Sequence, residues 1–296
     1  MLDARFARSW RKRRLARSSR LVSAALSAGV ATFGAAPAAR AAEHELSRVT
    51  ATTLSLELGG AALLTVGTLA LPTPEHCRWC APPSFDESLA IPAAPEGRRV
   101  AGKVSHVLSY AVIPALTTSA LLVPPLTTPE SNDHAPQNLA IVSEVVLLDL
   151  ALTLAVKKWV ARRRPAFYYR RTAYTEYRMD SREANVSFFS GDTSAAFAAA
   201  SAAATISFQR GYRSAPYVTA AGATFAVATG LLRSAADVHW PSDVLTGALL
   251  GTGLGLALPL LLHPRKAGDE ASPSAGAPLF SAGAAEPATV RFSGAF

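Results

Sequence analysis

The sequence predicts an all-α fold, a polytopic membrane bundle of about six spanning helices. Half of the 296 residues are hydrophobic, only 17% are charged, and the mean hydropathy is +0.21. Such a composition is unusual for a soluble domain of this length. Apolar segments recur along the chain, and several reach the roughly 20 residues that a helix needs to cross a bilayer. They comprise residues 49–71, 100–126, 139–160, 193–208, 217–232 and 244–263.

Residues 1–41 have the pattern of a targeting signal. Eight basic residues lie within the first twenty positions, residues 21–36 are apolar, and Ala39-Arg40-Ala41 is a small-residue cleavage site. We therefore expect a cleaved signal peptide, with an N-terminal anchor as the alternative. The net charge of +8 comes largely from this segment, so it does not indicate a nucleic-acid partner.

Residues 42–99 hold the first apolar segment and a Cys-x-x-Cys loop. Glu57 lies midway along the apolar segment and argues against residues 49–71 as a span, because an intramembrane carboxylate is costly. Cys77 and Cys80 favour a local disulfide in an oxidising compartment, with free thiols as the alternative. A zinc site needs two more ligands, and His76 is the only adjacent candidate.

Residues 100–263 form the expected helical core. Within it, residues 193–208 and 217–232 are short and rich in Ala and Gly, which favours close packing between helices over contact with lipid. Residues 264–296 are rich in Ala, Gly, Pro and Ser, and we expect this tail to be disordered.

Three short clusters in the core point to phosphate chemistry. Phosphoryl transfer needs fixed cations and donors around the phosphate, one nucleophile, and an acid that orients the nucleophile. The first cluster follows the third apolar segment, the second opens the fourth, and the third lies between the fifth and sixth. Because successive spans alternate in direction, all three fall on the same membrane face. They are Lys157 with Arg164-Pro165, Ser190-Gly191-Asp192, and Arg233 with His239 and Asp243.

The spacing within the clusters suits that role. Lys157 and Arg164 are seven residues apart, so we expect them on one face of a helix. His239 and Asp243 are four apart, with Pro241 between them to open a helix. The carboxylate can then fix the imidazole tautomer and leave the other nitrogen free to attack phosphorus. Taken singly, the clusters have simpler interpretations, namely a basic membrane anchor, a turn, a packed histidine and a helix cap.

The three motifs together resemble the type 2 phosphatidate phosphatases, a membrane family whose superfamily also contains the vanadium haloperoxidases. The chain has KKWVARRRP from Lys157, SFFSGDTS around Ser190, and LRSAADVHWPSD from Leu232. The family pattern also has three parts. The first is Lys, then six residues, then Arg-Pro, and the second is Pro-Ser-Gly-His. The third is Ser-Arg, then five residues, then His, then three residues, then Asp. The resemblance covers about residues 100–262, and the third motif is the most specific.

The resemblance implies a role for each matching residue. It assigns phosphate binding to Lys157, Arg164, Ser190, Gly191 and Arg233. It also makes His239 the nucleophile that forms a phosphohistidine, and Asp243 the residue that orients it.

Three positions depart from the family pattern, and the third departure affects the chemistry. Phe189 replaces Pro, Leu232 replaces Ser, and Asp192 stands where the family has its general-acid histidine. None of the six histidines of the chain lies beside Asp192 in the sequence. A carboxyl among cations is a poor acid, so we expect Asp192 to favour diphosphates, whose leaving group needs little protonation, over alkyl monoesters.

The sequence thus predicts a membrane phosphatase that acts on a lipid phosphate or polyprenyl diphosphate. The alternative is a non-catalytic member of the family that binds lipid phosphates and has lost turnover through Asp192. Vanadate-dependent halide oxidation is disfavoured, because the resemblance assigns the missing histidine a role there and those enzymes are soluble. We expect no cofactor and no metal. The predicted partners are the bilayer and the lipid substrate, and the predicted location is the cell inner membrane. The resemblance implies a site on the periplasmic or extracellular face. The alternative is a cytoplasmic site, which follows if the signal and the next three segments all cross the bilayer.

Overall fold

A computed structural model describes residues 44–127, 132–170 and 183–266, and these residues form helices and loops without a β-strand. The expectations for residues 1–41 and for most of the tail fall outside these ranges. The helices are α2 (Ala51–Ala70), α3 (Ser84–Leu89), α4 (Pro95–Val107), the π-helical turn η1 (Leu108–Val112), α5 (Ile113–Leu126), α6 (His134–Val160), α7 (Pro165–Tyr168), α8 (Gly191–Arg210), α9 (Ala215–Ala235) and α10 (Pro241–Leu262).

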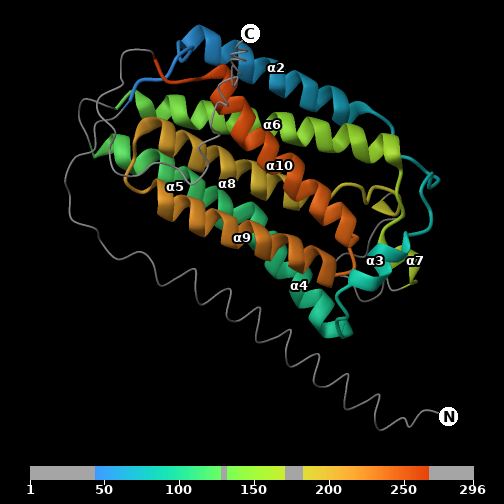
Figure 1. The fold of residues 1–296 in the computed structure, drawn as a ribbon. Helices are drawn as coiled ribbons and strands as arrows, with labels where there is room; N and C mark the ends of the chain where they lie inside the picture. Colours follow the sequence, from blue (N-terminus) through green and yellow to red (C-terminus); the bar gives the residue numbers. More distant parts are fainter. Residues whose placement is uncertain (1–43, 128–131, 171–182, 267–296) are drawn as a thin grey trace, which may run out of the picture. The chain divides into compact units, whose positions relative to one another are not determined.

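The all-α membrane architecture is confirmed. Among the described residues, five helical segments are long and apolar enough to cross a bilayer: α2, the continuous run from α4 through η1 to α5, α6, α9 and α10. The sixth predicted segment, residues 193–208, corresponds to α8. Most residues of α8 are buried, and it packs against α5, α6, α9 and α10 (Figure 1).

Glycines set the distance between α8 and α10. Gly247, Gly251 and Gly255 follow one another at intervals of four residues and face α8. A Cβ atom on Gly251 would lie 2.1 Å from the carbonyl oxygen of Ser194, and one on Gly255 would lie 2.5 Å from that of Ala198. The two helix backbones are therefore in direct contact, as small residues permit in membrane bundles. This bears out the expectation that residues 193–208 pack closely against other helices.

The first apolar segment, which Glu57 made a doubtful span, forms helix α2, and this helix is long and apolar enough to cross a bilayer. Glu57 lies in the second turn of α2, where its carboxylate is 3.5 Å from His263 Nε2 inside the bundle. Glu144 of α6 approaches the same nitrogen at 3.4 Å. The carboxylate therefore has a polar partner and does not face lipid. Exposed apolar residues cover the outer side of α2, namely Leu56, Leu63, Leu64, Val66 and Leu69.

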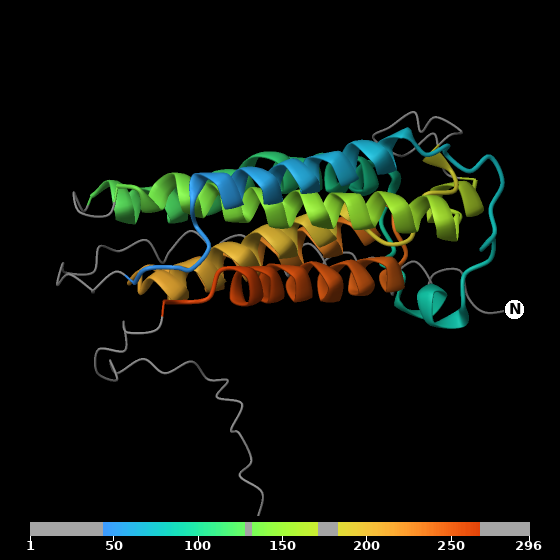
Figure 2. The same ribbon diagram turned by 90° about the horizontal axis from the view of Figure 1, so that it is seen from above.

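The direction of α2 is set by contacts at both of its ends, and it lies along α6 in both views (Figure 1 and Figure 2). Before α2 begins, the amide of His44 donates to the carbonyl of Arg210, the last residue of α8. Where α2 ends, Lys158 Nζ donates to the carbonyls of Thr68 and Leu69 at 2.7 and 2.9 Å. The helix therefore runs toward the end of the bundle at which α6 ends and α8 and α10 begin.

The glycine contact predicts a selective loss of stability. Replacing Gly251 by Ala forces a methyl group against the backbone of α8, and overpacking of this kind costs about 1–3 kcal/mol. We expect Gly251→Ala to lower the midpoint of thermal unfolding in detergent. Gly253→Ala is the matched control on the same helix, because a Cβ atom there meets nothing within 4 Å. Equal midpoints for both variants would contradict the packing described.

Candidate functional site

The three predicted motifs meet at one end of the bundle, but the first does not lie on a single helix as expected. Helix α6 ends at Val160, and Ala161 takes a left-handed conformation with φ of 50°. Lys157 therefore belongs to the last turn of α6, whereas Arg164 is the extended residue that precedes α7. The expectation of a shared helical face is wrong, because the chain reverses between them. Both side chains nevertheless reach the same site.

His239 lies between α9 and α10 and is almost completely buried. Its Nδ1 is 2.8 Å from the carbonyl oxygen of Ser187, which only accepts hydrogen bonds, so Nδ1 carries the proton. Its Nε2 is 3.2 Å from Nη1 of Arg164, which only donates, so Nε2 carries the lone pair. The unprotonated nitrogen therefore points toward a cation.

Burial and three cations act together on this imidazole. Burial lowers the pKa of His239 well below its ordinary value, and the positive charges of Lys157, Arg164 and Arg233 lower it further. His239 is consequently neutral over the physiological pH range. A neutral imidazole with its lone pair at Nε2 is the form that can attack an electrophile.

Asp243 acts on His239 less directly than its spacing predicts. Its Oδ2 is 3.7 Å from Nδ1 of His239, beyond hydrogen-bonding distance. The same oxygen accepts from the backbone amide of Trp240 at 2.9 Å and from the hydroxyl of Ser187. Asp243 is thus a helix cap for α10, and it positions Ser187, whose carbonyl holds the imidazole. Ser187 is the first residue of the segment SFFSGDTS, but the sequence analysis gave it no role.

Arg162 is a second residue that the sequence analysis missed. Helical periodicity from Lys157 puts Arg162 off the face of that lysine, yet its side chain is only 1% exposed. Its guanidinium pairs with Asp243 on one side and with Asp86 of α3 on the other. It also stacks on Trp79 at 3.7 Å from the ring centroid. No local pattern signals this role, because Asp86 and Trp79 come from the segment before the core.

Asp86 also binds the start of α10. Its Oδ1 accepts from the backbone amide of Ser242 at 2.8 Å, and its Oδ2 accepts from the hydroxyl of the same serine at 2.9 Å. Because Ser242 lies between Pro241 and Asp243, this contact holds the first turn of α10 against the loop that contains α3. The short helix α3 is therefore part of the framework of the site.

The second motif opens α8 at the same place. Ser190 is buried, its amide donates to the carbonyl of Asp243 at 3.0 Å, and its hydroxyl lies 2.8 Å from that of Thr193. Gly191 is the first residue of α8, and a Cβ atom there would lie 3.5 Å from Cε of Lys157. The N-terminal end of a helix, with its free amides, thus lies beside the lysine, and such an end favours anions.

Asp192 is engaged by other side chains of the protein. Its Oδ2 is 3.0 Å from Nη1 of Arg233, and its Oδ1 accepts from the hydroxyl of Tyr110 at 3.0 Å. His106 of α4 lies next to both, with Nδ1 4.0 Å from the carboxylate and Nε2 3.3 Å from Arg233. The sequence predicted Asp192 and Arg233 in the site, but it did not predict His106 or Tyr110.

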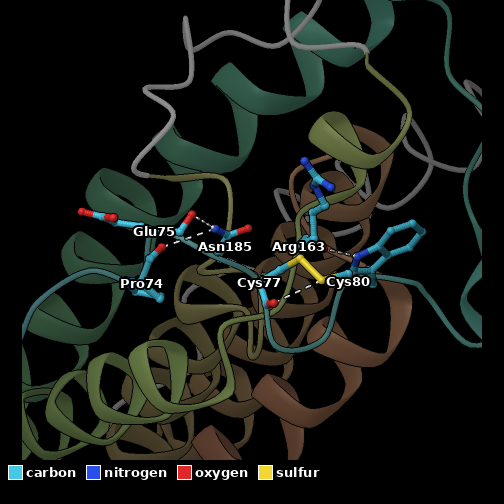
Figure 3. Close-up of a disulfide and its surroundings, with 7 residues drawn as sticks. Pro74, Glu75, Cys77, Cys80, Arg163 and Asn185 are labelled. Carbon is cyan, nitrogen blue, oxygen red and sulfur yellow. Dashed lines mark hydrogen bonds between the residues drawn. A yellow bond between two sulfur atoms is a disulfide. The ribbon is translucent and has the colours of Figure 1, made fainter.

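The loop of residues 74–80 covers the first motif and contains the disulfide that the sequence favoured (Figure 3). Cys77 and Cys80 are bonded to each other. The side-chain amide of Asn185 donates to the carbonyls of Pro74 and Glu75 at 3.3 and 2.9 Å. The amide of Arg163 donates to the carbonyl of Trp79 at 3.0 Å. The disulfide therefore lies at the same end of the bundle as the three motifs.

The described residues also bring possible metal ligands together at Glu57, Glu144 and His263, whose ligand atoms lie within 4.8 Å of one another. These residues belong to α2, the middle of α6 and the residue after α10. They contact none of the residues of the three motifs in the bonds described above, and we assign no metal to them.

Comparison with known proteins agrees with the motif content. Residues 138–267 match the PAP2 superfamily. The matched range includes all three motifs, so the resemblance seen in the sequence is confirmed at the level of the superfamily. Helices α2 to α5, and with them Asp86 and His106, lie outside the PAP2 match.

Among solved structures, the chain is similar to the first transmembrane PAP2 type phosphatidylglycerolphosphate phosphatase from Bacillus subtilis. The two share 18% sequence identity, with a TM-score of 0.39, over 70% of this chain and 84% of that chain. No curated protein sequence matches the chain.

The ion pairs of Arg162 predict that its side chain is needed for stability. Its position off the helical face of Lys157 suggests no such role. Arg162→Ala leaves two buried carboxylates without their cation, and breaking a buried pair in this way costs about 3–5 kcal/mol. We expect a large loss of thermal stability in detergent. Arg163→Ala is the matched control, because its side chain is exposed and only its backbone is bonded. An unfolding midpoint for Arg162→Ala equal to that of the control would refute this role.

Proposed function

We propose that the protein is an integral-membrane phosphatase that hydrolyses a lipid phosphate or polyprenyl diphosphate through a phosphohistidine at His239. The observation that carries the proposal is the state of this imidazole, which is neutral, has its lone pair at Nε2, and lies among three cations. The match of residues 138–267 to the PAP2 superfamily supports the same reaction class.

The phosphate group binds where the cations converge. Arg164 and Arg233 donate forked hydrogen bonds to its oxygens, and Lys157 contributes a point charge. Ser190 and the amide of Gly191 complete the site at the N-terminal end of α8. Each cation has a partner before the substrate arrives: the Val186 carbonyl for Lys157, Glu183 for Arg164 and Asp192 for Arg233.

The reaction proceeds in two steps. In the first, Nε2 of His239 forms a bond to phosphorus while the bond from phosphorus to the leaving oxygen breaks. Asp243 and Ser187 hold the ring and stabilise the positive charge that develops on it. In the second step, water attacks the phosphohistidine, the bond between nitrogen and phosphorus breaks, and inorganic phosphate leaves. The arginines and the lysine stabilise the negative charge of both transition states.

A second candidate function is a non-catalytic protein that binds lipid phosphates. It is favoured by one observation: Asp192 has no proton to donate while it is paired with Arg233 at 3.0 Å. Hydrolysis of short-chain phosphatidate or of an isoprenyl diphosphate by the purified protein separates the two functions. Binding without release of phosphate would favour the second.

We also propose that the site faces the periplasmic or extracellular side of the inner membrane. The disulfide of Cys77 and Cys80 supports this side, because disulfides persist in oxidising compartments. Since α2 runs toward the site, an outward site leaves residues 44–50 in the cytoplasm. This arrangement disagrees with the cleaved signal peptide that the sequence predicts for residues 1–41, because cleavage after translocation would leave residues 44–50 outside. The basic residues before Arg20 fit a cytoplasmic location.

The facing can be tested by labelling single cysteines in intact cells. Ser88 is exposed at the site end, and Lys266 is exposed at the opposite end, where its amide bonds the carbonyl of Glu45. We expect a membrane-impermeant maleimide to label Ser88→Cys in intact cells and to label Lys266→Cys only after permeabilisation. The reverse pattern would mean that the site faces the cytoplasm and would support a cleaved signal.

The mechanism is tested by removing the nucleophile. His239→Asn should lower kcat by more than about 10³-fold and abolish any acid-labile phosphoenzyme, because an asparagine amide cannot form the covalent intermediate. The measurement is phosphate release together with trapping of the phosphoenzyme. His76→Asn, an exposed histidine at the same end, is the control and should keep the full rate. A phosphoenzyme in the His239→Asn variant would show that another residue is the nucleophile.

A further inference from the structure

The proposed hydrolysis needs a proton donor that the three motifs do not supply. When the substrate is an alkyl phosphate, the leaving group is an alkoxide, whose conjugate acid has a pKa on the order of water's, near 16. Its oxygen therefore has to receive a proton as the bond to phosphorus breaks. Within the motifs, Lys157 and the arginines serve as cations for the phosphate, and arginine does not give up a proton in proteins.

Asp192 cannot fill this role in the arrangement described. Its carboxylate contacts Arg233 at 3.0 Å and accepts a hydrogen bond from Tyr110 at 3.0 Å. Both contacts favour the ionised form over the carboxylic acid. An ionised carboxylate can orient a neighbouring acid and stabilise its charged form, but it has no proton to donate.

His106 is the group that stands next to this carboxylate. Its Nδ1 is 4.0 Å from Oδ2 of Asp192. Its Nε2 is 3.3 Å from Nη1 of Arg233, one of the cations assigned to the phosphate. Because a guanidinium only donates, this contact is made by the neutral imidazole, and it has to open, as Arg233 turns to the phosphate, before Nε2 takes up a proton. The side chain of His106 is 25% exposed, whereas His239 is 2% exposed. His106 therefore lies at the open edge of the site, where the leaving group of a lipid substrate has to depart.

The local structure aims His106 at this position. It lies in the last turn of α4, directly before the π-helical turn η1. Tyr110, four residues later, stacks its ring on the imidazole at 5.4 Å between centroids and donates to Asp192. Single π-helical turns occur frequently at functional sites. The stacked ring of Tyr110 covers one face of the imidazole, and the carboxylate of Asp192 lies 4.0 Å away, close enough for an ionic interaction but not for a hydrogen bond.

We propose that His106 is the general acid that protonates the leaving oxygen, that the stacked Tyr110 positions it, and that the charge of Asp192 stabilises its imidazolium form. The proposal rests on the proposed function and deepens it. A histidine suits this task because imidazole ordinarily titrates near neutrality. Asp192 of α8 and His106 of α4 would together perform the role that the family pattern gives to the single histidine of its second motif.

The proton balance is closed over the two steps. In the first, the imidazolium of His106 gives its proton to the leaving oxygen as His239 Nε2 bonds to phosphorus, and the alcohol departs. In the second, the now neutral imidazole of His106 accepts a proton from the attacking water as the phosphohistidine breaks. Inorganic phosphate leaves, His239 is neutral again and His106 is again protonated.

This assignment changes the expected substrate class. With Asp192 alone, the sequence favours diphosphates, whose leaving group needs little protonation. With His106 as the acid, alkyl phosphomonoesters of lipids become substrates as well.

The experiment compares two leaving groups in the full-length purified protein. His106→Gln and His106→Asn are assayed in detergent micelles on short-chain phosphatidate and on p-nitrophenyl phosphate, whose phenolate departs without a proton. We expect kcat/KM for phosphatidate to fall about 10²- to 10⁴-fold, the usual contribution of general acid catalysis. For the aryl phosphate we expect a fall of less than about 10-fold, which also shows that the variants fold. His76→Gln is the control and should leave both activities unchanged.

Several outcomes would overturn the proposal. An equal loss on both substrates would mean that His106 acts in folding or phosphate binding, and no loss would mean that it takes no part. A selective loss of phosphatidate hydrolysis in Tyr110→Phe, without one in the His106 variants, would make the phenol the donor. Hydrolysis that survives His239→Asn would refute the proposed function itself, which is a different result from any of these.

Discussion

Arg162 is buried between the carboxylates of Asp86 and Asp243, and the geometry of the site depends on that pairing. A buried charge is tolerated when it is paired with opposite charges, and here the two carboxylates bind Nη1 and Nη2 while Trp79 covers one face of the guanidinium. The interaction joins three segments that are distant in the chain: the α3 loop, the connection from α6 to α7, and the first turn of α10. Asp243 is thereby fixed, and through Ser187 it fixes the imidazole of His239.

The cations of the site are balanced locally by the protein, and this balance explains how they can coexist. Lys157, Arg164 and Arg233 surround an imidazole that stays neutral because of their charge and its burial. Each cation meanwhile contacts a carbonyl or a carboxylate of the protein. A phosphate dianion can add to these contacts, and its charge is then shared by the three cations. The arrangement is therefore compatible with repeated binding and release of an anion.

The membrane bundle supplies the rigidity that this site needs. Helix α8 carries Ser190 and Asp192 at its first turn and is enclosed by its neighbours along most of its length. The glycines of α10 let the two backbones touch, and a Cβ atom on Gly247 would lie 2.6 Å from the carbonyl of Ser190. The distance between the second and third motifs is thus set by backbone contact. Side-chain motion affects that distance little.

The sequence alone determined the helical membrane class and the convergence of the three motifs at one end. These features follow from composition, from the alternation of spans and from spacings within a few residues, all of which are local. Only the tertiary structure decided that Glu57 faces inward, that Arg162 is buried against Asp86, and that His106 lies beside Asp192. Each of these contacts joins residues more than 70 positions apart, and no local pattern encodes such a contact.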